Sequence, residues 1–312
     1  MEVNMKLGEL LRSKKLVSAV VVLTMLAGFI VYDGSIGAAH AHSTFFRKDK
    51  IESNYYNVDH EVSILSQNLR APQDKDGKDN SITKRTPRIM NMLDKYNTDI
   101  RCFQECTYEW KARLDIQMSA MEYKTEFLFN NKGLCNPIYV KNSKFKVLDG
   151  GSMVLTPDST DTYNESRVAS WLKVADKTTG KTLVIMNAHL ATESTRQITS
   201  CTKMMEKVQT LDADGYIICG DFNFDMNSNP GAYAIMKGDT GKDMAIAAGQ
   251  EGVQKYTGGT FHDFGRKSKP KRIDFFFGSG NLQSKLYSLI KDSYDGGYLS
   301  DHYGILTYID IN

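Results

Sequence analysis

The sequence YIICGDFN at residues 216–223 decides the fold class, because it joins a short apolar run to polar residues that can carry chemistry. The run Tyr216–Cys219 is apolar and is followed by a glycine, which is typical of a buried strand. Asp221 and Asn223 come next. Since ligands of sheet-based folds bind where strands end, this segment predicts a site at one edge of a buried sheet.

The same arrangement recurs along the chain. Polar residues end or begin five further apolar runs, namely Asn68, Glu105, Asn187 with His189, Asp274, and Asp301 with His302. A single carboxylate or histidine at such a position is more often an ordinary loop or structural residue. Six segments of this kind in one chain indicate that their side chains converge on one site.

The runs between these residues predict the secondary structure. Strands are expected at residues 62–66, 100–104, 136–140, 152–155, 169–174, 183–187, 216–219, 272–277 and 303–309. Helix starts are expected at Thr86-Pro87, at Thr107, at Ser194 with Gln197 as a capping box, and at Asn229-Pro230. Many strands with interspersed helices predict a sheet-rich α/β or α+β sandwich.

Several short motifs make the chain resemble the endonuclease/exonuclease/phosphatase superfamily, in particular a branch of exported bacterial metal-dependent hydrolases. The motifs are TFHDF at 260–264 before RID at 272–274, NPIY at 136–139, LTPD at 155–158, NAHL at 187–190 and NLR at 68–70. The last two depart mildly from the N-T-H-L and N-I-R of that branch and keep the polar atoms. The resemblance covers nearly all of residues 60–312.

This resemblance implies a four-layer α/β (α+β) sandwich, in which two packed mixed β-sheets are flanked by helices. It also implies hydrolysis of a phosphoester bond by metal-assisted attack of water, with Mg²⁺ or Mn²⁺ as the cofactor. Oxygen ligands suit such hard cations. The reaction classes left open are a phosphatase, an extracellular nuclease, a sphingomyelinase-like lipid phosphodiesterase, and a non-catalytic surface protein on the same scaffold.

The resemblance also implies roles for particular residues. The expected metal ligands are Asn68, Glu105 and Asp301. His302, oriented by Asp274, is expected to be the catalytic imidazole, because an Asp–His pair fixes the tautomer of the ring. The other expected catalytic residues are Asp221 on the attacking water, Asn223 on a phosphate oxygen, and His189 on the scissile phosphate or the leaving group.

Six further residues are expected to contact the substrate or its phosphate, namely Asn187, Arg167, His262, Arg266, Lys267 and Lys269. The last three belong to a run with five basic residues in the seven positions 266–272. A polyanion contact and a solvated turn both explain this run. Nucleic acid is therefore a possible partner besides a small phosphate ester.

The N-terminal 41 residues predict export. A basic stretch precedes the uncharged run at residues 16–32, and small residues lead to Ala39-His40-Ala41. This order is typical of an export signal, which is either cleaved after Ala41 or kept as a single membrane anchor. We therefore expect a spacer at 42–57 and a catalytic domain at 58–312 that is secreted or anchored outside the cell membrane.

The composition excludes several classes of protein. Hydrophobic residues make up 41% and charged residues 24% of the chain, which excludes bulk disorder and a multi-pass membrane protein. The net charge of +2 excludes a uniformly basic nucleic-acid coat. Five cysteines form no dense framework, and only Cys106 with Cys135 is considered as a bridge. No pattern predicts an oligomer or a protein partner, so a monomer is the default.

Overall fold

The structure is a computed structural model that describes residues 55–312 except 121–122 and 158–164. The described part falls within a compact unit that runs from Lys50 to Asn312. The predicted export segment at 1–41 and most of the predicted spacer lie outside the described residues. Within the described part, no helix is long and apolar enough to cross a membrane.

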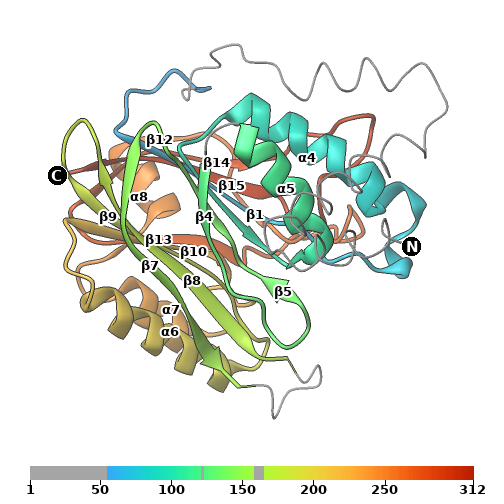
Figure 1. The fold of residues 1–312 in the computed structure, drawn as a ribbon. Coiled ribbons are helices and arrows are strands. Elements are labelled where there is room, and N and C mark those ends of the chain that lie inside the picture. The colour runs from blue at the N-terminus through green and yellow to red at the C-terminus, as the bar shows by residue number, and fades with distance from the viewer. Residues whose placement is uncertain (1–54, 121–122, 158–164) are drawn as a thin grey trace, which may run out of the picture. The chain divides into compact units, whose positions relative to one another are not determined.

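Two mixed sheets form the centre of this unit (Figure 1). The first sheet has the order β12 (Val253–Gln254), β14 (Leu282–Ile290), β15 (Gly304–Ile311), β1 (Val62–Asn68), β2 (Ile100–Gln104), β6 (Ile138–Lys141) and β4 (Tyr123–Glu126). The second has the order β11 (Lys242–Asp243), β13 (Asp274–Gly278), β10 (Gly215–Asp221), β9 (Thr182–His189), β8 (Arg167–Asp176) and β7 (Phe145–Thr156). A separate ribbon pairs β3 (Cys106–Thr107) with β5 (Leu134–Cys135).

Helices cover the outer faces of the two sheets, except that the helix at Met244–Glu251 packs against the core between the sheets. The helices are α4 (Ile82–Tyr96), α5 (Tyr108–Ala120), α6 (Ser194–Gln209), α7 (Pro230–Lys237) and α8 (Met244–Glu251), with short 3₁₀ turns at Asp74–Asp76 and Lys78–Asn80. In Figure 1, α6 and α7 lie under the second sheet, and α4 and α5 lie on the other side of the molecule, against the first sheet.

Three apolar clusters hold these layers together. Alternate strand residues point to opposite faces, so Ile64 packs between the sheets while Leu65 packs under α4 and α5. In the second sheet, Ile185 joins the core between the sheets and Met186 the layer under α6 and α7. The predicted four-layer sandwich is therefore confirmed.

One predicted helix start is wrong, and at a second helix the start is confirmed but the predicted N-cap is wrong. Helix α4 begins at Ile82 rather than after Thr86, and Pro87 lies inside it. The Thr86 hydroxyl donates to the carbonyl oxygen of Ile82 at 2.7 Å, so it bonds back along the helix and does not cap it. Ser194 is already helical, and its N-cap position is taken by Glu193. The starts after Thr107 and Asn229 are confirmed by bonds from the backbone N–H groups of Trp110 and Ala232.

Strand direction brings the polar strand ends together. Strands β1 and β2 are parallel, and so are β9 and β10, so their carboxyl ends share one edge of each sheet. Strand β13 runs antiparallel to β10 and pairs Asp274 with Asp221. Strand β15 runs antiparallel to β1, so the residues just before it also reach this edge.

Gly220 lets β9 and β10 meet closely at this edge. Its φ is +133°, and a Cβ atom there would lie 1.9 Å from the carbonyl oxygen of Ala188. Only glycine fits such a backbone and such a contact. The close contact with Ala188 therefore explains why a glycine directly precedes Asp221 in this motif.

Candidate active site

Asp221 lies at the centre of the converging side chains. Its Oδ2 atom accepts a hydrogen bond from Nδ2 of Asn68 at 2.9 Å. The same oxygen lies 3.6 Å from Nε2 of His189 and 3.6 Å from Nε2 of His302. Burial raises the pKa of Asp221 above its ordinary value, although both histidines oppose the shift. A carboxylate from one sheet thus meets an amide from the other between two imidazoles.

Glu105 stands beside this group, directly after β2. Its carboxylate accepts bonds from Nδ2 of Asn68 at 3.2 Å and from the backbone N–H of Ala71 at 2.8 Å. Its φ is +52°, an uncommon conformation for a residue other than glycine and one that often marks functional sites. Burial alone would raise the pKa of Glu105, but His189, the bond from Ala71 and Arg70 outweigh burial and lower it.

Asp274 and His302 form the shortest side-chain contact of the site. Nδ1 of His302 lies 2.8 Å from Oδ2 of Asp274, and both residues are buried. Thr260 holds the backbone of this strand start, because its hydroxyl oxygen accepts from the N–H groups of Ile273 and Asp274 at 3.1 and 3.2 Å. The predicted Asp–His pair is therefore present in the geometry.

The two histidines of the site differ in charge. Burial would lower the pKa of His302, but Asp274 and Asp221 outweigh burial and raise it to about 10. For His189, burial dominates and lowers the pKa below its ordinary value, and Arg167 adds to this effect. One imidazole is thus held protonated and the other neutral at pH 7, a separation that suits different proton-transfer roles.

Asn223 supports His189. Its Nδ2 atom lies 2.9 Å from Nε2 of His189 and donates to the carbonyl oxygen of Leu190 at 2.9 Å. Its backbone N–H donates to Oδ1 of Asp221 at 2.9 Å. The amide predicted to contact a phosphate oxygen therefore fixes the ring of His189 in this structure, and its phosphate contact stays a prediction.

Two overlapping groups of side chains could hold a metal ion. In each group, Glu105 with His189 and Asp221, or Asp221 with Asp274 and His302, the ligand atoms lie within 4.8 Å of one another. Carboxylate oxygens are the donors that divalent hard cations prefer. The group around Glu105 fits such an ion better, because Nδ1 of His302 is already bonded to Asp274.

Arg70 is a residue of the site that the sequence reasoning missed. Its guanidinium binds both carboxylate oxygens of Asp76 at 3.0 Å and lies 3.5 Å from Oδ2 of Asp301. Arg70 and His302 are thus cations close to the predicted metal ligand Asp301. Burial raises the pKa of Asp301. In the sequence, the only feature that pointed to Arg70 was its position two residues after Asn68.

Two predicted substrate contacts lie at different depths. Asn187 joins the two sheets, since it donates to the carbonyl oxygens of Phe103 and Pro137 and accepts from Gln104 at 2.7 Å. Its amide is fully used in this link and is not available to a phosphate. Arg167 is buried near His189, lies 3.2 Å from Glu165, and its Nε atom has no hydrogen-bond partner among the described residues.

The other predicted contacts lie in the segment before β13. His262 is buried between Tyr298 and Tyr303, accepts from the N–H of Gly265 at 3.1 Å, and has a pKa lowered to about 4 by burial. It is therefore a neutral packing residue. Arg266, Lys267 and Lys269 are exposed. Arg272 pairs with Asp243 at 2.6 Å and therefore does not contribute to the exposed basic surface.

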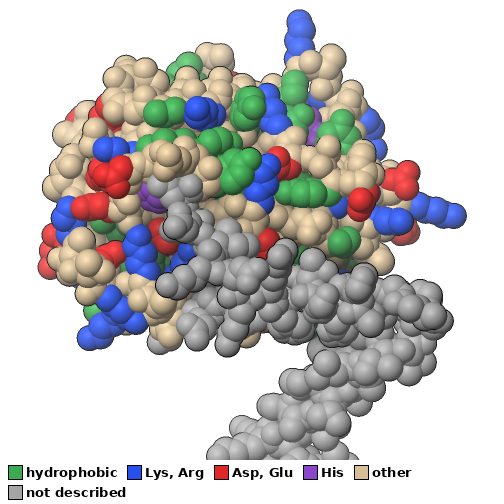
Figure 2. Space-filling view, turned by 90° about the horizontal axis from the view of Figure 1, so that it is seen from above, with side chains coloured by type: hydrophobic (Ala, Val, Ile, Leu, Met, Phe, Trp, Pro, Cys, Tyr) green, Lys and Arg blue, Asp and Glu red, His purple; other side chains and the backbone are tan. Residues whose placement is uncertain are grey.

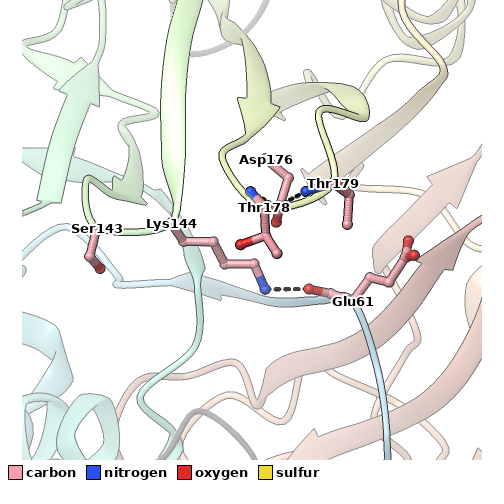
Figure 3. A pocket seen from close by; sticks show the side chains of 6 residues that line it. All are labelled: Glu61, Ser143, Lys144, Asp176, Thr178 and Thr179. Atoms are coloured by element: carbon pink, nitrogen blue, oxygen red, sulfur yellow. Dashed lines mark hydrogen bonds between the residues drawn. The ribbon is translucent and has the colours of Figure 1, made fainter.

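The charges of the exposed surface are mixed rather than segregated. Figure 2 shows Lys and Arg side chains interspersed with Asp and Glu over the displayed face. A separate cavity is lined by Glu61, Ser143, Lys144, Asp176, Thr178 and Thr179 (Figure 3). None of the predicted site residues lines it.

Comparison with known proteins gives the family. The family model described as "Endonuclease/Exonuclease/phosphatase family" matches residues 55–302. A search of curated proteins gives no match.

Solved structures share the fold. The endonuclease/exonuclease/phosphatase from Bacteroides vulgatus is 22% identical, with a TM-score of 0.71 over 80% of this chain and 99% of that one. The mannosyl-6-phosphatase Bt3783 of Bacteroides thetaiotaomicron is 23% identical, with a TM-score of 0.69 over 80% and 99%. The D. rerio TDP2 structure complexed with a single-strand DNA product is 20% identical, with a TM-score of 0.64 over 80% and 99%.

The match spans most of the chain and includes every strand end that contributes to the site. The members of this family are divalent-metal-dependent hydrolases of phosphoester bonds. The chain belongs to the Endonuclease/Exonuclease/phosphatase family and is a hydrolase of this type.

Proposed function

We propose that this enzyme is an exported phosphoesterase that uses Mg²⁺ or Mn²⁺ and hydrolyses a small phosphate ester. The observation that carries the proposal is the buried Asp274–His302 pair at 2.8 Å, which faces Asp221 within 3.6 Å. Nδ1 of His302 bonds to Asp274, so Nε2 of His302 faces Asp221 at the centre of the site. Such a pair keeps a protonated imidazole where the charge of a phosphoryl group would develop.

Glu105 and Asn68 would hold the cation in this proposal. A bound divalent ion polarises a phosphoryl oxygen and neutralises developing negative charge. Mg²⁺ usually keeps several waters and takes only one or two carboxylates, which fits a site with Glu105 as the one carboxylate ligand. Asp301 would act on this group through Arg70 and not as a direct ligand.

The remaining residues would bind and orient the substrate. Asp221 would accept a proton from the attacking water or orient it, while His302 would donate to the phosphoryl group. His189, fixed by Asn223, would face the scissile phosphate or the leaving group. Arg167 would contribute an anion contact beside it, because its Nε atom is buried without a partner among the described residues.

A small ester is the first choice of substrate. One structural relative, Bt3783 of Bacteroides thetaiotaomicron, is a mannosyl-6-phosphatase, and its match covers 80% of this chain. A phosphorylated sugar would place one phosphate in the buried site and its ring outside. The proposed export, by the segment at 1–41, would give the enzyme substrates outside the cell, and a monomer suffices for this site.

A second candidate is a nuclease. The exposed side chains of Arg266, Lys267 and Lys269 lie in the segment that leads to Asp274. Basic side chains beside a site of this kind would bind successive phosphates. A structural relative, D. rerio TDP2, has been crystallised with a single-strand DNA product.

A substrate panel tests both candidates. The purified full-length chain, in mild detergent, is incubated with sugar phosphates, inositol phosphates, plasmid DNA, RNA and sphingomyelin, each with Mg²⁺, with Mn²⁺ or with chelator. We expect chelator-sensitive release of phosphate from a sugar phosphate. Turnover of DNA or RNA alone at low salt would favour the nuclease, and no turnover of any ester by a folded chain would overturn the proposal.

A further inference from the structure

Cys106 and Cys135 lie opposite each other in the ribbon formed by β3 and β5. They are register partners in this antiparallel pair. Directly opposite residues of an antiparallel pair have Cα atoms about 4.5 or 5.5 Å apart, and disulfides span about 4.4–6.8 Å. The backbone therefore already holds these two cysteines at the separation that a disulfide requires.

The two side chains also share one buried face of the ribbon. Both residues have 0% exposure, and both belong to the apolar cluster under α4 and α5. The Cys135 thiol contacts the carbonyl oxygen of Cys106 at 3.3 Å. No rearrangement of the strands is needed to bring the sulfur atoms together.

The other three cysteines lack this arrangement. Cys102 and Cys219 come from different sheets and meet in the core between them, where no strand register pairs their backbones. The thiols of Cys102 and Cys219 contact each other, so the strand register is what distinguishes Cys106 and Cys135 from this pair. Cys201 lies on α6 under the outer face of the second sheet. The chain thus contains a matched pair of buried cysteines that serves as a comparison.

We propose that Cys106 and Cys135 form a structural disulfide when the chain matures in an oxidising environment. The oxidant is a small-molecule disulfide such as glutathione disulfide. One protein thiolate attacks it and releases one glutathione, and the second thiolate attacks the mixed disulfide and releases the other. The two thiol protons pass to the two released glutathione thiolates, and the two electrons that the cysteines lose reduce glutathione disulfide.

The link would tie down the segment that follows Glu105. It would close a loop of residues 107–134, which contains α5 and β4. It would also fix the backbone directly after Glu105, whose φ is +52°. Loop closure of this length predicts a rise of about 5 °C in Tm for a chain of this size. This inference goes beyond the proposed reaction and does not depend on it.

Thiol counting by mass spectrometry tests the proposal. The reduced full-length chain is incubated at pH 8.5 with glutathione disulfide in denaturant below its unfolding midpoint, quenched with acid, fully denatured and alkylated. We expect three alkyl groups, a mass 2 Da below that of the reduced chain before alkylation, and a cross-linked peptide pair containing residues 106 and 135. Five alkyl groups, persistent glutathione adducts or a link between other cysteines would overturn it.

Two variants provide matched controls. Cys135→Ala is expected to lose the link and the rise in Tm on oxidation, while Cys219→Ala is expected to keep both. The same loss in Cys219→Ala would contradict the assignment. The thiol count of the unmodified chain decides the matter if Cys135→Ala does not fold.

Discussion

The two ends of the paired sheets handle charge in opposite ways. At the end that carries the site, the buried carboxylates of Asp221, Asp274 and Asp301 and the half-buried carboxylate of Glu105 lie close to Arg70, His189 and His302. At the other end, the buried carboxylate of Asp99 lies beside two lysines, and Glu61 pairs with Lys181. The comparison separates charges that stabilise the fold from charges that are retained at a cost in stability, as expected of an active site.

At the end of the sheets opposite the site, the charged contacts surround Asp99. Its carboxylate lies 3.1 Å from Nζ of Lys144 and 3.5 Å from Nζ of Lys141, and it accepts from the hydroxyl and the N–H of Ser63 at 2.9 and 3.0 Å. Burial would raise the pKa of Asp99, but Lys144, Lys141 and Ser63 outweigh burial and lower it. Figure 3 shows Lys144, whose Nζ atom donates to the backbone carbonyl oxygen of Glu61, beside the cavity at this end.

The same substitution at the two ends is predicted to have opposite effects. Asp221→Asn should lower turnover by roughly 10³-fold, since it removes the group expected to act on water. It should also leave Tm unchanged or raise it, because the buried carboxylate has a raised pKa and is ionised at a cost. Turnover and thermal unfolding are measured on the same sample. Retained turnover would contradict the site.

Asp99→Asn is the matched variant, with a smaller effect that falls on stability. It should lower the free energy of unfolding by about 2 kcal/mol at pH 7 and leave kcat unchanged. Because the folded pKa of Asp99 is depressed, its contribution is present above the unfolded pKa of about 3.9 and is lost as pH falls through the folded value. Denaturation of both proteins from pH 7 to pH 3 should show the difference shrinking. A constant difference would contradict this account.

Arg70→Ala tests whether Asp301 acts through Arg70. Loss of the guanidinium should lower kcat by about 10-fold to 100-fold, as for other groups that orient a metal site, with KM less affected. Arg70→Lys should restore only part of kcat, since lysine cannot bind Asp76 through two nitrogens. Arg113→Ala, which removes an arginine from an i,i+4 surface pair, is the control. Equal kcat in both alanine variants would sink the assignment.

The exposed basic residues are predicted to matter least for a small ester. Lys267→Gln with Lys269→Gln should leave turnover of a sugar phosphate within about 2-fold. If DNA binds, the slope of log affinity against log salt should fall by roughly 1 for each lysine. Lys177→Gln with Lys237→Gln, both exposed elsewhere, is the control. A large loss on the small ester would show that the segment belongs to the phosphate site.

Most of the fold followed from short apolar runs bounded by polar residues. Strands β1, β2, β9 and β10 were predicted within three residues at each end, because they are buried on both faces and read as unbroken apolar segments. Strand β14 was missed, since serine and lysine interrupt its apolar residues. The start of α4 was misplaced because Pro87 is tolerated inside the helix.

The sequence predicted many single residues of the candidate site but not which of their side chains contact one another. Strand ends indicated Asp221, Asp274 and His302, but only parallel pairing of β1 with β2 and of β9 with β10 shows which side chains meet. The sequence could not show that the side-chain amide of Asn187 forms hydrogen bonds that link the two sheets. Nor could it place Arg70 between Asp76 and Asp301, since such contacts depend on loop geometry.

The most direct test of the difference between the two ends uses two histidines. His302 pairs with Asp274 in the site, while His60 stacks on Tyr308 at 3.9 Å and bonds to the carbonyl oxygen of Val58. Hydrolysis of the best phosphoester substrate is measured for the unmodified chain, His302→Ala and His60→Ala, each with Mg²⁺ and with chelator.

The account predicts chelator-sensitive turnover that His60→Ala keeps and His302→Ala lowers by roughly 10³-fold, with both variants folded. Turnover that survives in a folded His302→Ala, or that chelator does not affect, would contradict it.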